Sequence, residues 1–163
     1  MVKKLGIAAA VLAIASMAFS ALAPAVSASE PTPPARVPDV LLRGTGVLDA
    51  QGTGVAAVKG RMDYRATADE GILLVKDING DAMVDIDGFG GTGEWRGFKA
   101  YFGIRGNVHI VGSDVAVILV GHDIDLHVEG RGWAFLKGEG RFTVNGRGPF
   151  PWTADGAFAS VTP

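Results

Sequence analysis

Apolar and polar residues alternate along most of the chain beyond residue 39, a pattern typical of β-strands with one buried face. Val, Ile, Phe and Thr fill these stretches, and glycine makes up 24 of the 163 residues. Much of this glycine recurs in G-x-G units with a period of eight, at 44–46, 52–54, 130–132, 138–140 and 146–148. Because such units suit tight hairpins, we expect an all-β fold of short strands.

The G-x-G units can be tested as hairpin loops by asking which side chains they bring together. A loop centred on Arg131 places Val128 opposite Ala134, so apolar residues meet. Repeating this step keeps one face apolar, which favours an antiparallel meander with G-x-G hairpins, folded as a two-sheet sandwich or a rolled barrel. A two-armed β-solenoid with a coil of about 16 residues, its arms at 39–87 and 107–153, preserves the same alternation and is the alternative.

The N-terminus has the pattern of a secretory signal peptide. Lys3 and Lys4 precede an apolar run, and Val26-Ser27-Ala28 is a small-x-small cleavage site, so we expect a signal peptide at 1–28. Residues 29–38, SEPTPPARVP, are predicted to be a Pro-rich linker. Residues 39–163 are expected to be a single β domain with a glycine- and aromatic-rich insert at 88–106. The predicted location is secreted, or periplasmic and cell-envelope.

Composition narrows the classes of function. The chain has no cysteine, which excludes disulfides, thiolate nucleophiles and zinc-thiolate sites. Loss of Lys3 and Lys4 with the signal would take the formal net charge from −2 to −4, so the charge suggests neither a nucleic-acid partner nor an anionic membrane surface. After signal cleavage, no remaining apolar run reaches the ~18 residues of a membrane span.

One stretch, DINGDAMVDIDG, begins at Asp77 and resembles the first half of an EF-hand or dockerin-type calcium loop. Asp77, Asn79 and Asp81 match that pattern, but alanine and glycine stand at its sixth and twelfth positions. We therefore expect a structural turn at Asn79-Gly80, joining paired strands with Val75 opposite Val84. A weak calcium site at the three residues is the alternative, and no other cofactor is predicted.

The polar residues show no pattern typical of an enzyme. His109 and His127 are predicted to face outward on either side of Val117, about 10 Å apart, too far to share one metal ion. A small secreted enzyme acting on polysaccharide remains an alternative, and it would need two carboxylates near Trp95 or Trp133.

The strongest functional signal is an apolar outer face predicted for the second arm, where the first arm is polar. The aromatic insert is expected to be a lid on that face or a stacking platform for a sugar. The candidate ligand-binding or interface residues are Trp95, Phe98, Tyr101, His109, Val117, His127, Trp133 and Phe135. We expect a secreted, non-catalytic, envelope-associated binding or assembly module, with an envelope glycan or a second copy as partner.

Overall fold

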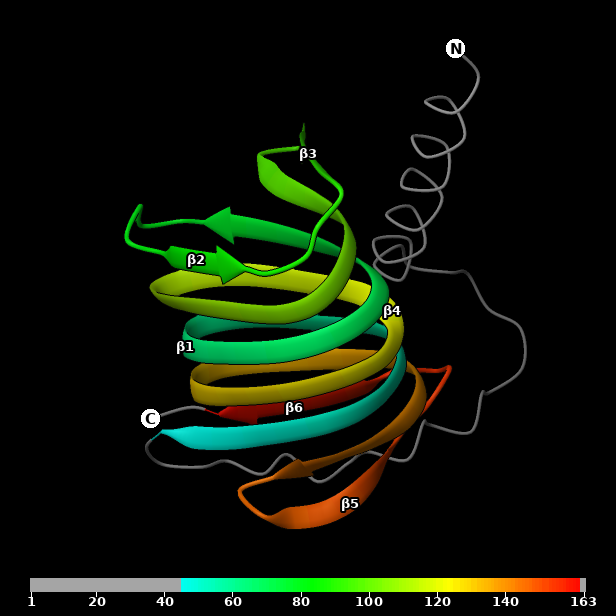
Figure 1. The fold of residues 1–163 in the computed structure, drawn as a ribbon. Coiled ribbons are helices and arrows are strands. Elements are labelled where there is room, and N and C mark those ends of the chain that lie inside the picture. The colour runs from blue at the N-terminus through cyan, green and yellow to red at the C-terminus, as the bar shows by residue number, and fades with distance from the viewer. Residues whose placement is uncertain (1–44, 162–163) are drawn as a thin grey trace, which may run out of the picture. The chain divides into compact units, whose positions relative to one another are not determined.

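A computed structural model describes residues 45–161, so the predicted signal peptide and linker lie outside the described residues. The strands are β1 (Gly46–Asp77), β2 (Met83–Ile86), β3 (Gly91–Trp95), β4 (Phe98–Val144), β5 (Arg147–Trp152) and β6 (Ala157–Val161). All six belong to one antiparallel sheet, which confirms the all-β prediction (Figure 1). Within residues 45–161 there is no helix long and apolar enough to cross a membrane.

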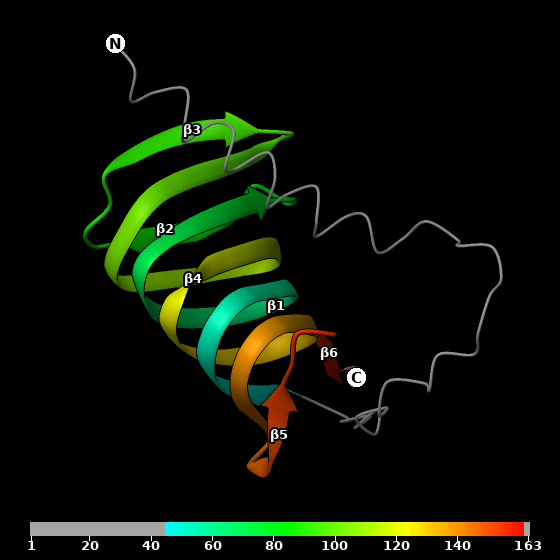
Figure 2. The same cartoon turned by 90° about the vertical axis from the view of Figure 1, so that its right-hand side faces the viewer.

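Strands β1 and β4 are unusually long, with 32 and 47 residues, and they wind around each other as a two-stranded coil (Figures 1 and 2). Each turn of β1 lies between two turns of β4. Leu48, for example, pairs with both Val128 and Val144, which are 16 residues apart. The sheet follows the coil and does not close on itself.

This register differs from the predicted hairpins. The partners of Val128 are Leu48 and Tyr64 rather than Ala134, so β1 and β4 join the two arms to each other. It is the register that the two-armed alternative requires. Pairing within the second arm occurs where β5 meets the end of β4, with Phe150 opposite Phe142. Side-chain alternation could not separate the two folds, because a coil of 16 residues and a hairpin repeat of eight residues preserve the same parity.

The G-x-G units at 52–54, 130–132 and 138–140 are corners inside continuous strands, whereas 146–148 includes the turn between β4 and β5. Gly54 faces Gly138 across the ladder, and both have positive φ, +139° and +150°. A Cβ atom on Gly138 would run into the carbonyl oxygen of Thr53. Glycine is therefore needed where neighbouring turns bend together and their backbones come close.

Inward-facing residues of successive turns form one apolar core, which includes Leu48, Ala56, Tyr64, Leu73, Ile110, Leu126, Leu136 and Phe142. Two β-bulges in the middle of β4, beyond an earlier one at Gly103, change which of its residues face the core. While β4 advances three residues, from Gly112 to Val115, β1 advances only two, from Gly60 to Met62. The extra residue reverses the alternation until a second bulge near Asp123, whose φ is +47°.

These bulges correct part of the predicted outer face. Val117 was expected to face outward, but it is fully buried, as are Val115 and Leu119 on either side of it. The neighbours Ile118 and Val120 take the outward positions and are half-buried.

The predicted turn and insert also have different neighbours from those expected. The turn after Asp77 leads to β2, where Val84 pairs with Ile110 rather than Val75. The insert supplies β3, which forms a hairpin with the start of β4, with Trp95 paired to Phe98. It extends the sheet instead of covering it as a lid.

Candidate functional site

The coil has two outer faces, one for each half-turn between corners. The first, which we call the polar face, carries Asp49, Gln51, Asp63, Arg65, Thr67, Asn107, His109, Asp125, His127, Glu129, Arg141 and Thr143, with Val47 and Val111 at its margins. The second, which we call the apolar face, carries Val55, Ala57, Ile72, Leu74, Ala116, Ile118, Val120, Trp133 and Phe135, with Lys59, Lys76 and Lys137 along its margins.

The centre of the apolar face is a column of side chains that crosses five neighbouring strand segments. Its order, set by the register, is Phe135, Ala57, Ile118, Leu74 and Ala100. Leu74 and Ala100 are only 6% and 1% exposed although they lie outside the core cluster. Side chains on this face therefore pack against one another and form a continuous apolar surface.

An aromatic cluster ends this column. Trp133 and Phe135 both contact Phe158 of β6, with ring centroids 6.2 Å and 4.8 Å apart. Trp133 is 43% exposed and Phe158 is 63% exposed. Two of the predicted candidate residues are thus brought together, and Phe158 is a member that the sequence analysis missed because it did not place β6 beside β4.

The charges on the apolar face are all of one sign. Among the described residues that define it, the ionisable side chains are Lys59, Lys76 and Lys137. The Lys76 ammonium lies 5.8 Å from the ring centroid of Phe98, so its stem lies against the aromatic end of the sheet. This arrangement gives an apolar strip with cationic margins.

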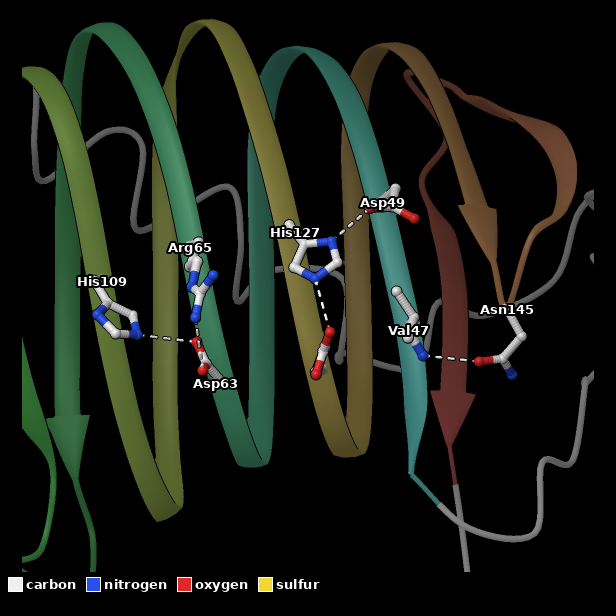
Figure 3. A network of polar contacts seen from close by, with 8 residues as sticks. Val47, Asp49, Asp63, Arg65, His109, His127 and Asn145 are labelled. Carbon is white, nitrogen blue, oxygen red and sulfur yellow. Dashed lines mark hydrogen bonds and ion pairs between the residues drawn. The ribbon is translucent and has the colours of Figure 1, made fainter.

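The polar face holds a network of ionisable groups (Figure 3). His109 Nε2 lies 3.0 Å from Asp63 Oδ1, and the Arg65 guanidinium donates to the other carboxylate oxygen at 3.2 Å. Arg65 is the register partner of both His109 and His127, a place that the sequence analysis had given to Val117. The two histidines do lie on the same face, as predicted, and a charged strand segment separates them.

His127 is held between two carboxylates. Its Nδ1 lies 2.6 Å from Asp49 Oδ1 and its Nε2 lies 3.2 Å from Glu129 Oε1. The hydrogen bond to Asp49 raises the pKa of His127 above its ordinary value, and Glu129 adds to this effect. The two ring nitrogens engage different carboxylates, and within residues 45–161 no cluster of three metal-ligating side chains occurs.

In the calcium-like stretch, the Asp77 carboxylate accepts hydrogen bonds from the backbone N–H groups of Gly80 and Ala82, at 2.8 and 2.9 Å. Asp81 accepts from the backbone N–H of Ser113, and Asn79 donates to the Ser113 hydroxyl.

Hydrogen bonding from the Ser113 hydroxyl, and then from its N–H, lowers the pKa of Asp81. These contacts close a turn against the neighbouring corner of β4. A calcium site at Asp77, Asn79 and Asp81 stays a prediction.

Three further candidates, Trp95, Phe98 and Tyr101, lie at the opposite end of the coil from the aromatic cluster. Trp95 and Phe98 pack at the tip of the β3–β4 hairpin, 6.5 Å between centroids, with Arg96 over the indole. Tyr101 is 7% exposed and contacts Phe89 edge to face. The eight predicted residues therefore fall on the polar face, the apolar face, the hairpin and the core, and do not form one site.

Comparison of the chain with protein-family models, with curated proteins and with solved structures found no match.

Proposed function

We propose that this chain is an exported, non-catalytic module that attaches to an anionic amphipathic layer of the cell envelope through its apolar face. The observation that carries the proposal is a continuous apolar outer strip whose ionisable side chains are all lysines. Export rests on the signal-peptide pattern at 1–28.

The chemistry of the apolar face matches a layer of anionic lipids. Exposed aromatic side chains such as Trp133 and Phe158 favour the boundary between headgroups and acyl chains. Lysines at the margin can bury their stems while their ammonium groups reach the anionic headgroups.

The polar face would fix the orientation of the module. On that side Asp49, Asp63, Asp125 and Glu129 outnumber the two arginines, Arg65 and Arg141, so the formal charge of the face is negative. An anionic layer would repel it, so the apolar face is the one that contacts the layer.

A second candidate, binding of an envelope glycan, is favoured by one feature alone. Trp133, Phe135 and Phe158 form an exposed aromatic cluster on a sheet face, and such rings can stack on sugars. The aliphatic side chains that make up the rest of the apolar face are better suited to acyl chains.

Vesicle binding tests the proposal. Residues 29–163 are mixed with vesicles of phosphatidylglycerol and phosphatidylcholine, or of phosphatidylcholine alone, and co-sedimentation and tryptophan emission are recorded. Binding should require the anionic lipid. The double variant Lys59→Glu/Lys137→Glu should lose about tenfold or more in affinity, at roughly 1 kcal/mol for each charge near the surface.

The matched control is Arg65→Glu/Arg141→Glu, which makes the same charge change on the polar face and should not weaken binding. Equal losses of affinity in both double variants would show that binding depends only on the net charge of the chain. That result would contradict the proposed orientation of the apolar face toward the lipid. Saturable emission changes with solubilised glycans but not with vesicles would favour the second candidate. A stable dimer by light scattering without vesicle binding would assign the apolar face to self-association.

A further inference from the structure

One corner of the coil brings two arginines together. Arg61 of β1 is the register partner of Arg131 of β4, and both residues are exposed. Neighbouring strands are about 4.8 Å apart, so the two side chains leave the sheet side by side, and like charges placed in this way destabilise a sheet. At the opposite corner, the equivalent ladder position pairs Thr53 with Glu139. The arginine pair is therefore an unfavourable feature of one corner unless an anion lies between the two charges.

A groove of about 580 Å³ lies beside this pair. Its lining combines the two arginines with three carboxylates and two apolar side chains, namely Asp63, Asp81, Glu129, Met83 and Val111. Met83 is 76% exposed and Val111 is 39% exposed. The volume is in the range of sites that take a small molecule or a lipid headgroup.

The carboxylates of the groove already have partners within the chain. Asp63 contacts Arg65 and His109, Glu129 contacts His127, and Asp81 accepts a hydrogen bond from Ser113. Among the causes that lower the pKa of Asp81, the hydrogen bonds of Ser113 come first and the charge of Arg61 comes last.

The two arginines differ from these carboxylates. Within residues 45–161, neither Arg61 nor Arg131 forms an ion pair. The charges of the groove that lack a partner in this part of the chain are therefore both positive, which predicts an anionic ligand.

We propose that Arg61 and Arg131 bind the phosphate group of a phosphate monoester. One guanidinium donates two parallel hydrogen bonds to an oxyanion, and a carboxylate, with two oxygens, is matched by one such fork. A phosphate monoester has three free oxygens and can accept from both arginines. The rest of the ester would lie along the groove, against the exposed side chains of Met83 and Val111.

This site goes beyond the apolar strip on which the proposed attachment rests. The corner lies between the two faces, and Lys59 and Trp133 of the apolar face are two residues away from Arg61 and Arg131 along their strands. A phosphate monoester could reach the corner as the headgroup of phosphatidic acid or as a soluble molecule. The chemistry at the two guanidinium groups is the same in both cases.

Calorimetric titration of residues 29–163 with glycerol 3-phosphate tests the site without any lipid. Binding should be saturable, and Arg61→Gln/Arg131→Gln should lower the affinity about tenfold or more, because each fork contributes charge-assisted hydrogen bonds. The matched control is Arg141→Gln/Arg147→Gln, which removes the same charge away from the groove and should change the affinity by less than about twofold. Arg131→Lys keeps the charge but loses the fork, so the affinity should fall severalfold.

Thermal unfolding gives a second readout that separates binding from folding. Arg61→Gln/Arg131→Gln removes two opposed like charges, so without ligand the variant should melt no lower than wild type. Glycerol 3-phosphate should raise the Tm of wild type and leave that of the double variant unchanged, because only a ligand bound to the native state stabilises it.

The source of the phosphate is distinguished by a parallel titration with vesicles that contain phosphatidic acid. Arginine-dependent binding of the soluble ester would support the site and a soluble ligand, and arginine-dependent binding of the vesicles alone would support the site and a lipid headgroup. Acetate at equal ionic strength should bind far more weakly, and an equal affinity for acetate would overturn the assignment to phosphate.

Equal losses of affinity in the groove and control variants, or no arginine-dependent binding of either probe, would overturn the site. Vesicle binding that persists in Arg61→Gln/Arg131→Gln would leave the proposed attachment of the apolar face intact. Failure of this site is therefore distinguishable from failure of the proposed function.

Discussion

The polar and apolar faces are built from the same two strands, yet their outward side chains have opposite character. Each arm contributes to both faces, because every eight residues a corner carries the chain from one side of the coil to the other. Asp63 and Lys76, for instance, both belong to β1 but lie on different faces. The polarity of the outward side chains therefore depends on the half-turn and not on the arm. The sequence analysis had instead predicted one polar arm and one apolar arm.

The two faces also differ in how their residues are held. On the apolar face, Leu74 is almost fully buried by its neighbours although it points away from the core. On the polar face, the ion pair of His109 and Asp63 has side chains 45% and 37% exposed. Exposed ion pairs contribute about 0–1 kcal/mol, so lateral packing makes the apolar face the larger contributor to stability.

The largest expected loss in the free energy of unfolding comes from a substitution at a corner, because the corners separate the two faces. In Gly132→Ala, the new Cβ would collide with the carbonyl oxygen and carbon of Lys59 and with Gly60. We expect a loss of roughly 4 kcal/mol or more, or no folded protein, by circular dichroism and urea unfolding. Gly91→Ala is the control, since that position has open space and should change stability by less than about 1 kcal/mol. Similar stability of the two variants would contradict the role of the corner.

A smaller loss of stability is expected when one side chain on each face is shortened, and the two losses compare the faces directly. Leu74→Ala should cost about 2–3 kcal/mol in the free energy of unfolding, because it empties a packed position on the apolar face. Thr67→Ala, at an exposed position of the polar face, should cost less than about 1 kcal/mol. Urea unfolding measures both, and an equal cost at the two positions would show that lateral packing does not distinguish the faces.

The turn after Asp77 connects the apolar half-turn of β1 to β2 on the polar side. Asp77→Ala removes the acceptor for two backbone N–H groups and should cost about 1 kcal/mol. Asp85→Ala, an exposed acid on β2, is the control and should be near neutral. We expect the wild-type Tm to be the same in millimolar calcium and in chelator. A calcium-dependent rise in Tm that Asp77→Ala abolishes would assign the turn to metal binding instead.

The smallest effect concerns the polar face alone. The hydrogen bond to Asp49 raises the folded-state pKa of His127, partial burial of the ring opposes this rise, and Glu129 adds to it. Stability from its protonated form is therefore full below the ordinary value of 6.5 and is lost as the pH rises through the folded-state pKa.

His127→Gln should be less stable than wild type by at most about 0.5 kcal/mol near pH 5.5, and the difference should vanish by about pH 8.5. A difference that grows with pH would reverse the sign and contradict the role of the two carboxylates.

The strands and much of the core could be predicted from the sequence. Val128 and Ala134 were predicted to share one apolar face, and both lie in the core, because alternation along a strand is a local property of the sequence. The pairing of the arms is not local. A hairpin centred on Arg131 and a coil corner at Arg131 keep the same residues inside, so the pattern of residues alone cannot separate them.

The sites were less predictable for a related reason. Placing Val117 outside failed because one extra residue between Gly112 and Val115 reverses the alternation, and a bulge has only a weak sequence signature. Phe158 could have been found from the alternation in its short C-terminal strand. The pairing of His127 with Asp49 required the arm-to-arm register, which places residues 78 positions apart side by side.

The two-stranded coil has a consequence for the order in which the protein can fold. Each turn of β1 has its ladder partners on β4, so residues 46–77 on their own have no strand to pair with. During synthesis the first arm therefore stays unpaired until the second arm has been made. Closure then depends on contacts that are distant in sequence, which predicts slow, cooperative folding and no stable fragment made of either arm alone.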